Sequence, residues 1–137
     1  MKNKKLLIIA IAAVLAFIWG NSMLSREVSQ RLSDSVQSGI TQAAGGDTSG
    51  EVNSAALRKA AHFCEFAVLG GLTALLLQRR KKGCFKAFIF SAACAAIDET
   101  IQIFSNRGSS ISDVILDCFG AFFGVLVMFL FLTRKDK

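Results

Sequence analysis

The sequence predicts an all-α protein, a polytopic bundle of about four transmembrane helices. Of its 137 residues 53% are hydrophobic, proline is absent, and the mean hydropathy is +0.48. Several apolar runs approach the roughly 20 residues that a helix needs to cross the hydrocarbon core of a bilayer. The predicted spans are residues 6–23, 60–77, 85–104 and 111–133.

The positions of the basic residues predict the orientation of the bundle. Lys and Arg accumulate in short cytoplasmic segments of membrane proteins. In this chain they cluster before the first span, between the second and third, and after the fourth. Four spans put these clusters on one side, so we expect both termini in the cytoplasm. This clustering also accounts for the net charge of +6 without a nucleic-acid partner.

Residues 1–24 are predicted to form an N-terminal membrane anchor. Lysines followed by an apolar run are also typical of a secretory signal. However, Trp19-Gly20-Asn21-Ser22-Met23 is a poor match to the small residues of a cleavage site, which favours an uncleaved anchor.

Residues 25–57 are predicted to form an extracytoplasmic polar segment. Apolar residues recur at intervals of four in its first part, at Val28, Leu32, Val36 and Ile40. This pattern fits an amphipathic helix on the membrane surface, and the richness in Ser and Gly equally fits a flexible loop.

Residues 58–137 form the predicted core of three transmembrane helices, and pairs of ionisable residues lie at one end of each. The pairs are His62 and Glu65, Asp98 and Glu99, and Asp113 and Asp117. The predicted topology brings all of them to the outer leaflet. Ionisable residues are costly in a membrane and mark pairs, polar cavities or reactive sites. They are the candidate site.

Helical spacing predicts which side chains share a face, because residues three or four apart are neighbours on a helix. The predicted stripes are Arg58, His62 and Glu65; Asp98 and Gln102; and Asp113, Asp117, Gly120 and Gly124. The Gly-x-x-x-Gly pattern permits close helix approach, so we expect the third stripe to face the bundle and to carry both aspartates inward. Ser112 is expected to cap the last helix.

Three cations, Arg58, Lys59 and Arg107, accompany the acids on the side where basic residues are normally sparse. In one interpretation they bind an anionic group such as phosphate, while His62 and the carboxylates transfer protons or hold a divalent metal. In the other, the cations neutralise the acids and the network only holds the helices together. Transport is a weaker third candidate, because neither an inverted repeat nor a broken helix is evident.

Three charged motifs, taken in order, resemble the VanZ-like family of bacterial integral membrane proteins. The motifs are Arg58-Lys59-x-x-His62-x-x-Glu65-Phe66, Asp98-Glu99-x-x-Gln102-x-Phe104-x-x-Arg107 and Asp113-x-x-x-Asp117-x-x-Gly120. The chain departs from the family pattern at Asp117, where the family often has asparagine, and at Ser105-Asn106, where proline is common before the arginine.

The resemblance implies a role in the bacterial cell envelope and a place in the cytoplasmic membrane, because the founding member is associated with resistance to the lipoglycopeptide teicoplanin. The expected site binds or modifies an anionic envelope component, either a lipid-linked phosphate or a peptidoglycan precursor. An oligomer is compatible with the sequence, and the cofactor is left open, with a divalent metal as a candidate. A non-catalytic protein that alters antibiotic or partner access is the alternative.

The expected roles divide the site residues into three groups. The catalytic group is His62, Glu65, Asp98, Glu99 and Asp113; the anion-binding group is Arg58, Lys59 and Arg107; and the supporting group is Gln102 and Asp117.

Overall fold

The computed structural model describes residues 2–24, 54–77, 81–105 and 110–135, with isolated positions between 28 and 39. The helices are α1 (Lys2–Ser22), α3 (Ser54–Leu77), α4 (Lys81–Phe104) and α5 (Ile111–Lys135). All four are long and apolar enough to cross a membrane. The predicted all-α fold with four spans is therefore confirmed. Leu32 and Ile40, on which the predicted surface helix depends, lie outside the described residues.

Helices α3 and α4 begin earlier than the apolar runs that predicted them. The predicted starts were residues 60 and 85, whereas the helices begin at Ser54 and Lys81. The added turn of α3 reads Ser-Ala-Ala-Leu-Arg-Lys and is rich in strong helix formers. Because this turn contains two charged residues, its mean hydropathy is low and it was not included in the predicted span. Hydropathy therefore predicts the limits of the membrane span better than the limits of the helix.

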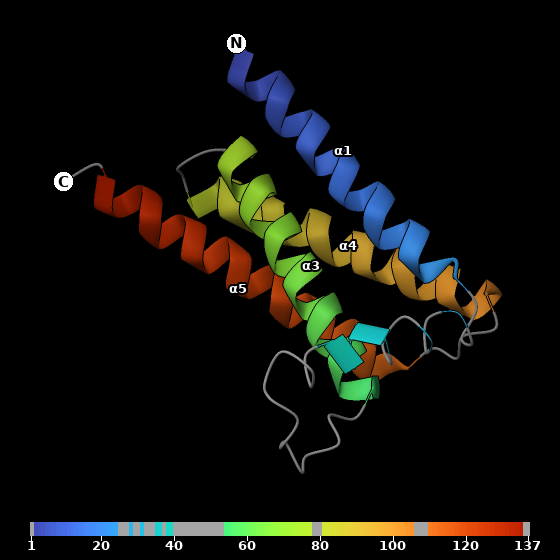
Figure 1. Ribbon diagram of the computed structural model, residues 1–137. Coiled ribbons are helices and arrows are strands. Elements are labelled where there is room, and N and C mark those ends of the chain that lie inside the picture. Colours follow the sequence, from blue (N-terminus) through green and yellow to red (C-terminus); the bar gives the residue numbers. More distant parts are fainter. Residues whose placement is uncertain are drawn as a thin grey trace.

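The centre of the bundle is α3, which packs against α1, α4 and α5 (Figure 1). Helix α4 also contacts α1 and α5. Successive helices run in opposite directions, so α1 and α4 end where α3 and α5 begin, at the lower right of Figure 1. We call this the polar end of the bundle, because the ionisable residues of the candidate site lie there.

Large apolar side chains are found on the outside of the bundle as well as in its core. Those exposed on α5 are Ile111, Ile115, Phe119, Phe122, Phe123, Leu126, Val127, Leu130 and Phe131. The buried core contains Ile18, Phe66, Leu69, Ala95 and Ala121. An exposed apolar surface of this extent is unusual for a water-soluble monomer and fits contact with lipid.

Helices α3 and α5 approach each other so closely that their backbones touch. A Cβ atom added at Gly70, Gly120 or Gly124 would collide with a backbone carbonyl of the facing helix, which for Gly124 is that of Ala67. Only glycine fits such positions, as in other close transmembrane helix pairs. The prediction that the α5 glycines face the bundle is confirmed. We call these three glycines the glycine seam.

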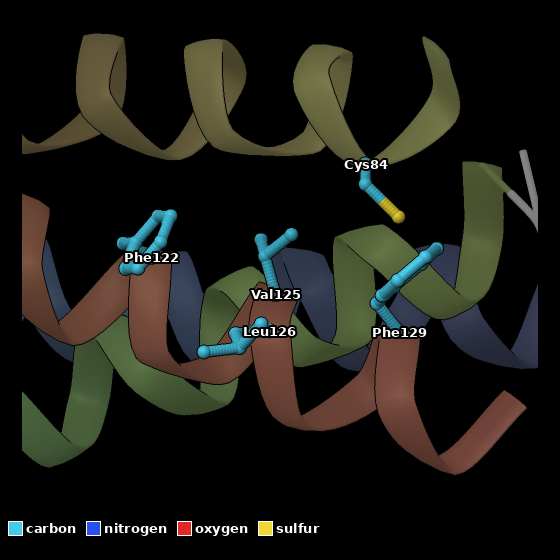
Figure 2. Close-up of a pocket in the computed structure, with 5 residues that line it drawn as sticks. All are labelled: Cys84, Phe122, Val125, Leu126 and Phe129. Atoms are coloured by element: carbon cyan, nitrogen blue, oxygen red, sulfur yellow. The ribbon is translucent and has the colours of Figure 1, made fainter. Parts of the chain in front are cut away.

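Two apolar hollows flank α5 further along the helix, away from the polar end. One, of about 270 Å³, lies between α4 and α5 and is lined by Cys84, Phe122, Val125, Leu126 and Phe129 (Figure 2). The other, of about 350 Å³, is lined by Ala67, Val68, Gly71, Leu72, Phe123, Gly124, Val127 and Met128. Neither hollow contains a charged side chain, so the charged groups of the polar end are separate from them.

Candidate functional site

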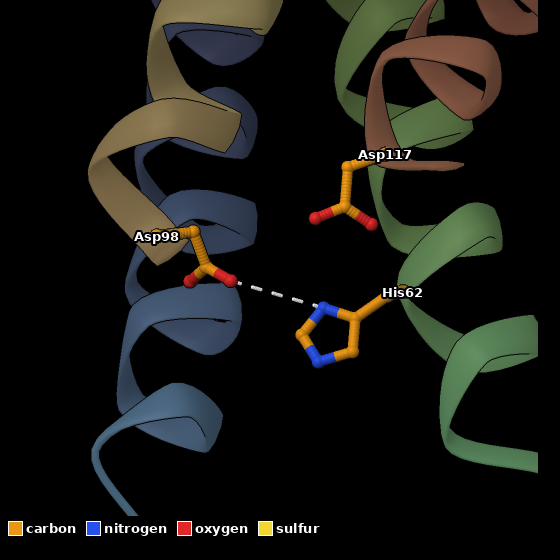
Figure 3. A group of neighbouring side chains, drawn as sticks. All are labelled: His62, Asp98 and Asp117. Carbon is orange, nitrogen blue, oxygen red and sulfur yellow. Dashed lines mark ion pairs between the residues drawn. The ribbon is translucent and has the colours of Figure 1, made fainter. Parts of the chain in front are cut away.

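Ionisable side chains from three helices meet at the polar end. His62 of α3, Asp98 of α4 and Asp117 of α5 point toward one another (Figure 3), and one donor atom from each lies within 4.8 Å of the other two. The aspartates are only 0% and 2% exposed. The fold therefore assembles a buried group from distant parts of the sequence. We call these three residues the His-Asp-Asp cluster.

The imidazole of His62 lies between carboxylates of two helices. Its Nδ1 atom is 3.6 Å from Oε2 of Glu65, one turn along α3, and 3.9 Å from Oδ2 of Asp98. Both separations are longer than a direct hydrogen bond. The imidazole therefore occupies the space between Glu65 of its own helix and the buried Asp98 of α4.

The two aspartates of the cluster have carboxylate oxygens that lack hydrogen bonds. Asp98 accepts a hydrogen bond from Nε2 of Gln102 through Oδ2, at 2.8 Å, as their spacing predicts. Within the described residues, Oδ1 of Asp98 and Oδ1 of Asp117 have no hydrogen-bond partner. Burying a carboxylate oxygen without a partner is costly. Such a group in a folded protein therefore points to a functional role.

Glu99 adjoins Asp98 in sequence but holds two helices together. Its Oε1 atom accepts a hydrogen bond from the backbone N–H of Ser110, at 2.6 Å, which ties the end of α4 to the start of α5. The Ser110 carbonyl in turn accepts from the N–H of Asp113, at 2.8 Å. The prediction that Ser112 caps α5 is wrong, because the helix begins at Ile111 and Ser110 takes the cap position.

Replacing Glu99 by alanine is therefore expected to destabilise the bundle by about 1–3 kcal/mol, because the Ser110 N–H loses a charged acceptor. Denaturant unfolding in detergent, followed by circular dichroism, measures the change. Thr100→Ala on the same turn of α4 is the matched control, since its side chain is exposed and bonds only the Ala96 carbonyl of its own helix. Equal stability of the two variants would contradict this role for Glu99.

The rim of the site carries cations. Nζ of Lys59 lies 2.9 Å from Oδ1 of Asp113, and the two side chains are 52% and 31% exposed. Asp113 therefore faces α3, but it pairs with Lys59 at the rim and does not join Asp117 in the buried cluster, because it lies one turn nearer the helix start. Arg58 is half-buried and forms no salt bridge with a described residue. Arg107 lies outside the described residues.

Asp117 points inward, as its stripe predicts, but it belongs to the cluster itself and does not merely support it. Two buried hydroxyl groups were not predicted from the sequence. Ser22 of α1 and Ser91 of α4 are fully buried, and their hydroxyl groups have no hydrogen-bond partner in the described part of the chain. Single serines are ordinary in apolar helices, so the sequence gives no signal for them.

Comparison with known proteins identifies a family. The family model described as VanZ/LLP1 matches residues 7–132, which takes in most of every described helix. No curated protein and no solved structure matches the chain. The resemblance inferred from the three charged motifs is confirmed by this match, and the chain belongs to the VanZ/LLP1 family.

Proposed function

We propose that the polar end of the bundle faces the outside of a bacterial cytoplasmic membrane and binds an anionic component of the cell envelope. The ligand class is a lipid-linked phosphate or a peptidoglycan precursor. The orientation follows from the basic residues at the opposite ends of the helices, since Lys and Arg accumulate on the cytoplasmic side.

The observation that carries this proposal is the exposed ion pair of Lys59 and Asp113 at the rim. Half of the Lys59 side chain is accessible, with Nζ 2.9 Å from Asp113. Exposed pairs of this kind contribute only about 0–1 kcal/mol, so a phosphate oxygen can replace the carboxylate at little cost. Arg58, on the same turn of α3 and on the stripe of His62 and Glu65, would offer a bidentate fork to the head group from the side of the cluster. We include Arg107 in this anion-binding group.

The His-Asp-Asp cluster supplies the chemistry in this proposal. His62 and Asp98, with Glu65 beside the imidazole, are the acid and base groups that would exchange protons with the bound head group. The hydrogen bond of Glu99 to Ser110 assigns Glu99 a supporting part instead. Asp113 positions Lys59 by its ion pair.

A second candidate is a non-catalytic membrane protein that alters antibiotic or partner access. Two contacts that favour it tie neighbouring segments together, Lys59 of α3 to Asp113 of α5 and Glu99 of α4 to Ser110 just before α5. Such polar contacts also stabilise transmembrane bundles. In either case a link to lipoglycopeptide resistance would arise through the precursor, because a protein that holds the precursor changes how teicoplanin reaches it.

Lys59→Ala and Arg58→Ala are each expected to weaken binding of a polyprenyl phosphate by about tenfold or more, because each removes a charge-assisted contact of about 1.5–3 kcal/mol. Titration of the detergent-solubilised full chain with polyprenyl phosphate in mixed micelles measures the affinity. Lys86→Ala is the matched control, because this exposed lysine lies near the opposite end of the bundle.

Equal weakening by Lys86→Ala would mean general attraction to anionic micelles. The absence of saturable binding to the wild-type chain would contradict the proposal outright.

A further inference from the structure

We propose that His62, Asp98 and Asp117 bind a single divalent cation of the Zn²⁺ and Mn²⁺ class. This site goes beyond the proposed function and does not depend on it, because a metal ion can bind whether or not an envelope lipid does. Three features of the His-Asp-Asp cluster support this site: the distances between its donor atoms, its unpaired buried oxygens and its charge.

The spacing of the donor atoms fits one shared ion. Two ligand atoms that each lie about 2.1 Å from a tetrahedral or octahedral ion are roughly 3–4.2 Å apart. The distance of 3.9 Å between Nδ1 of His62 and Oδ2 of Asp98 is in this range. The three donor atoms lie within 4.8 Å of one another. A small rotation of the Asp117 carboxylate would bring its oxygen to the distance from the other two donors that a shared ion requires.

An independent observation comes from the oxygens that the protein leaves without partners. Asp117 is 2% exposed, its Oδ1 atom has no hydrogen-bond partner within the described residues, and its carboxylate points into the space between His62 and Asp98 (Figure 3). Oδ1 of Asp98 is likewise buried and unpaired. A cation at the centre of the cluster supplies the interaction that these oxygens lack.

The charge of the cluster matches a divalent ion. No lysine or arginine among the described residues forms a salt bridge with Asp98 or Asp117, and their one ion-pair contact is that of Asp98 with His62. Two buried carboxylates without a permanent cation are strongly destabilising in a medium of low dielectric constant. One divalent ion with a neutral imidazole cancels both charges.

Residues around the cluster complete the arrangement expected of a metal site. Gln102 donates to Oδ2 of Asp98 at 2.8 Å and fixes the carboxylate, as outer-shell partners of metal ligands commonly do. Oε2 of Glu65 lies 3.6 Å from Nδ1 of His62, beside the group of three donors and not within it. One imidazole nitrogen with carboxylate oxygens suits Zn²⁺ and Mn²⁺, and Zn²⁺ is expected to bind more tightly.

The test is direct metal binding to the full chain in detergent, after chelator treatment and without added lipid. Titration calorimetry with ZnCl₂, and metal analysis after desalting, are expected to give one Zn²⁺ per chain. Asp117→Asn and Asp98→Asn are each expected to raise the dissociation constant at least about 100-fold, because each replaces a charged carboxylate ligand by a neutral amide oxygen that binds the metal more weakly. Asp113→Asn is the charge-matched control and is expected to change it less than about threefold.

Three results would overturn the site: no saturable binding to the wild type, unchanged affinity in both cluster variants, or equal weakening in Asp113→Asn. If Asp117→Asn fails to fold, His62→Gln replaces it, and the visible absorption of bound Co²⁺ reports whether a nitrogen ligand is lost. Polyprenyl phosphate binding that persists without metal binding would remove this inference alone. Metal binding without phosphate binding would remove the proposed function alone.

Discussion

Replacing Gly124 by alanine is expected to destabilise the bundle by about 3 kcal/mol or more, the largest stability loss that the structure predicts for a single methyl group. The added Cβ atom would overlap the backbone carbonyl of Ala67 in the facing helix. A carbonyl held in a helix cannot rotate away as a side chain can. Helices α3 and α5 would therefore have to separate, which would also part His62 from Asp117.

Denaturant unfolding in detergent, followed by circular dichroism, measures this loss. The matched control is Gly71→Ala on α3, next to the seam, where the nearest atom to the added Cβ, the Gly124 carbonyl oxygen, is 3.5 Å away, an ordinary contact. A second control is Gly20→Ala, where nothing lies within 4 Å. Both are expected to match the wild type or to gain up to about 1 kcal/mol from the better helix propensity of alanine. Wild-type stability of Gly124→Ala would show that the helices do not pack in this way.

Asp98→Asn is expected to leave a folded protein that no longer responds to ZnCl₂. The amide oxygen can still accept the hydrogen bond from Gln102, which is 2.8 Å from the native carboxylate. The substitution also removes a buried charge that lacks a permanent cation, so the chelator-treated variant is expected to melt at or above the wild type. At a concentration of 100 times the dissociation constant, ZnCl₂ or polyprenyl phosphate is expected to stabilise the wild type by about 2.7 kcal/mol.

The variant is expected to show almost none of the stabilisation by ZnCl₂ but to keep that by polyprenyl phosphate, because Asp98 belongs to the His-Asp-Asp cluster and not to the anion-binding group. Thermal unfolding of both proteins, with and without each ligand, measures the difference. Glu99→Ala provides the opposite pattern, because Glu99 binds the Ser110 N–H and its loss weakens the fold itself. If Asp98→Asn instead loses stability in every condition and neither ligand stabilises the wild type, the polar cluster only holds the helices together and is not a binding site.

The sequence predicts the spans well because each is a nearly continuous apolar run, and the medium imposes the length of a span. It also brings the ionisable residues to one end, because the direction of successive spans alternates. What it leaves undetermined is the rotation of each helix about its axis. Asp98 and Glu99 are adjacent, so one of them faces the bundle centre and the other turns toward α5. The backbone N–H of Ser110, just before α5, donates to Glu99, and so Glu99 is the one that turns toward α5.

The roles of Asp113 and Asp117 show the same limit. Both lie on one stripe of α5, and spacing alone predicts that both point inward. Their depth along the helix separates them, because Asp113 is in the first turn and meets the exposed Lys59, whereas Asp117 lies one turn deeper among α3 and α4. Spacing along one helix cannot supply this distinction, because it depends on where the neighbouring helices end.

The glycine seam has a mechanical consequence for the site. A helix bundle adjusts to a bilayer that is thicker or thinner than its apolar length by tilting its helices. Helices α3 and α5 touch backbone to backbone at Gly120, within one turn of both His62 and Asp117. They must therefore tilt as one rigid body, and the separation of these two side chains is insulated from changes in membrane thickness.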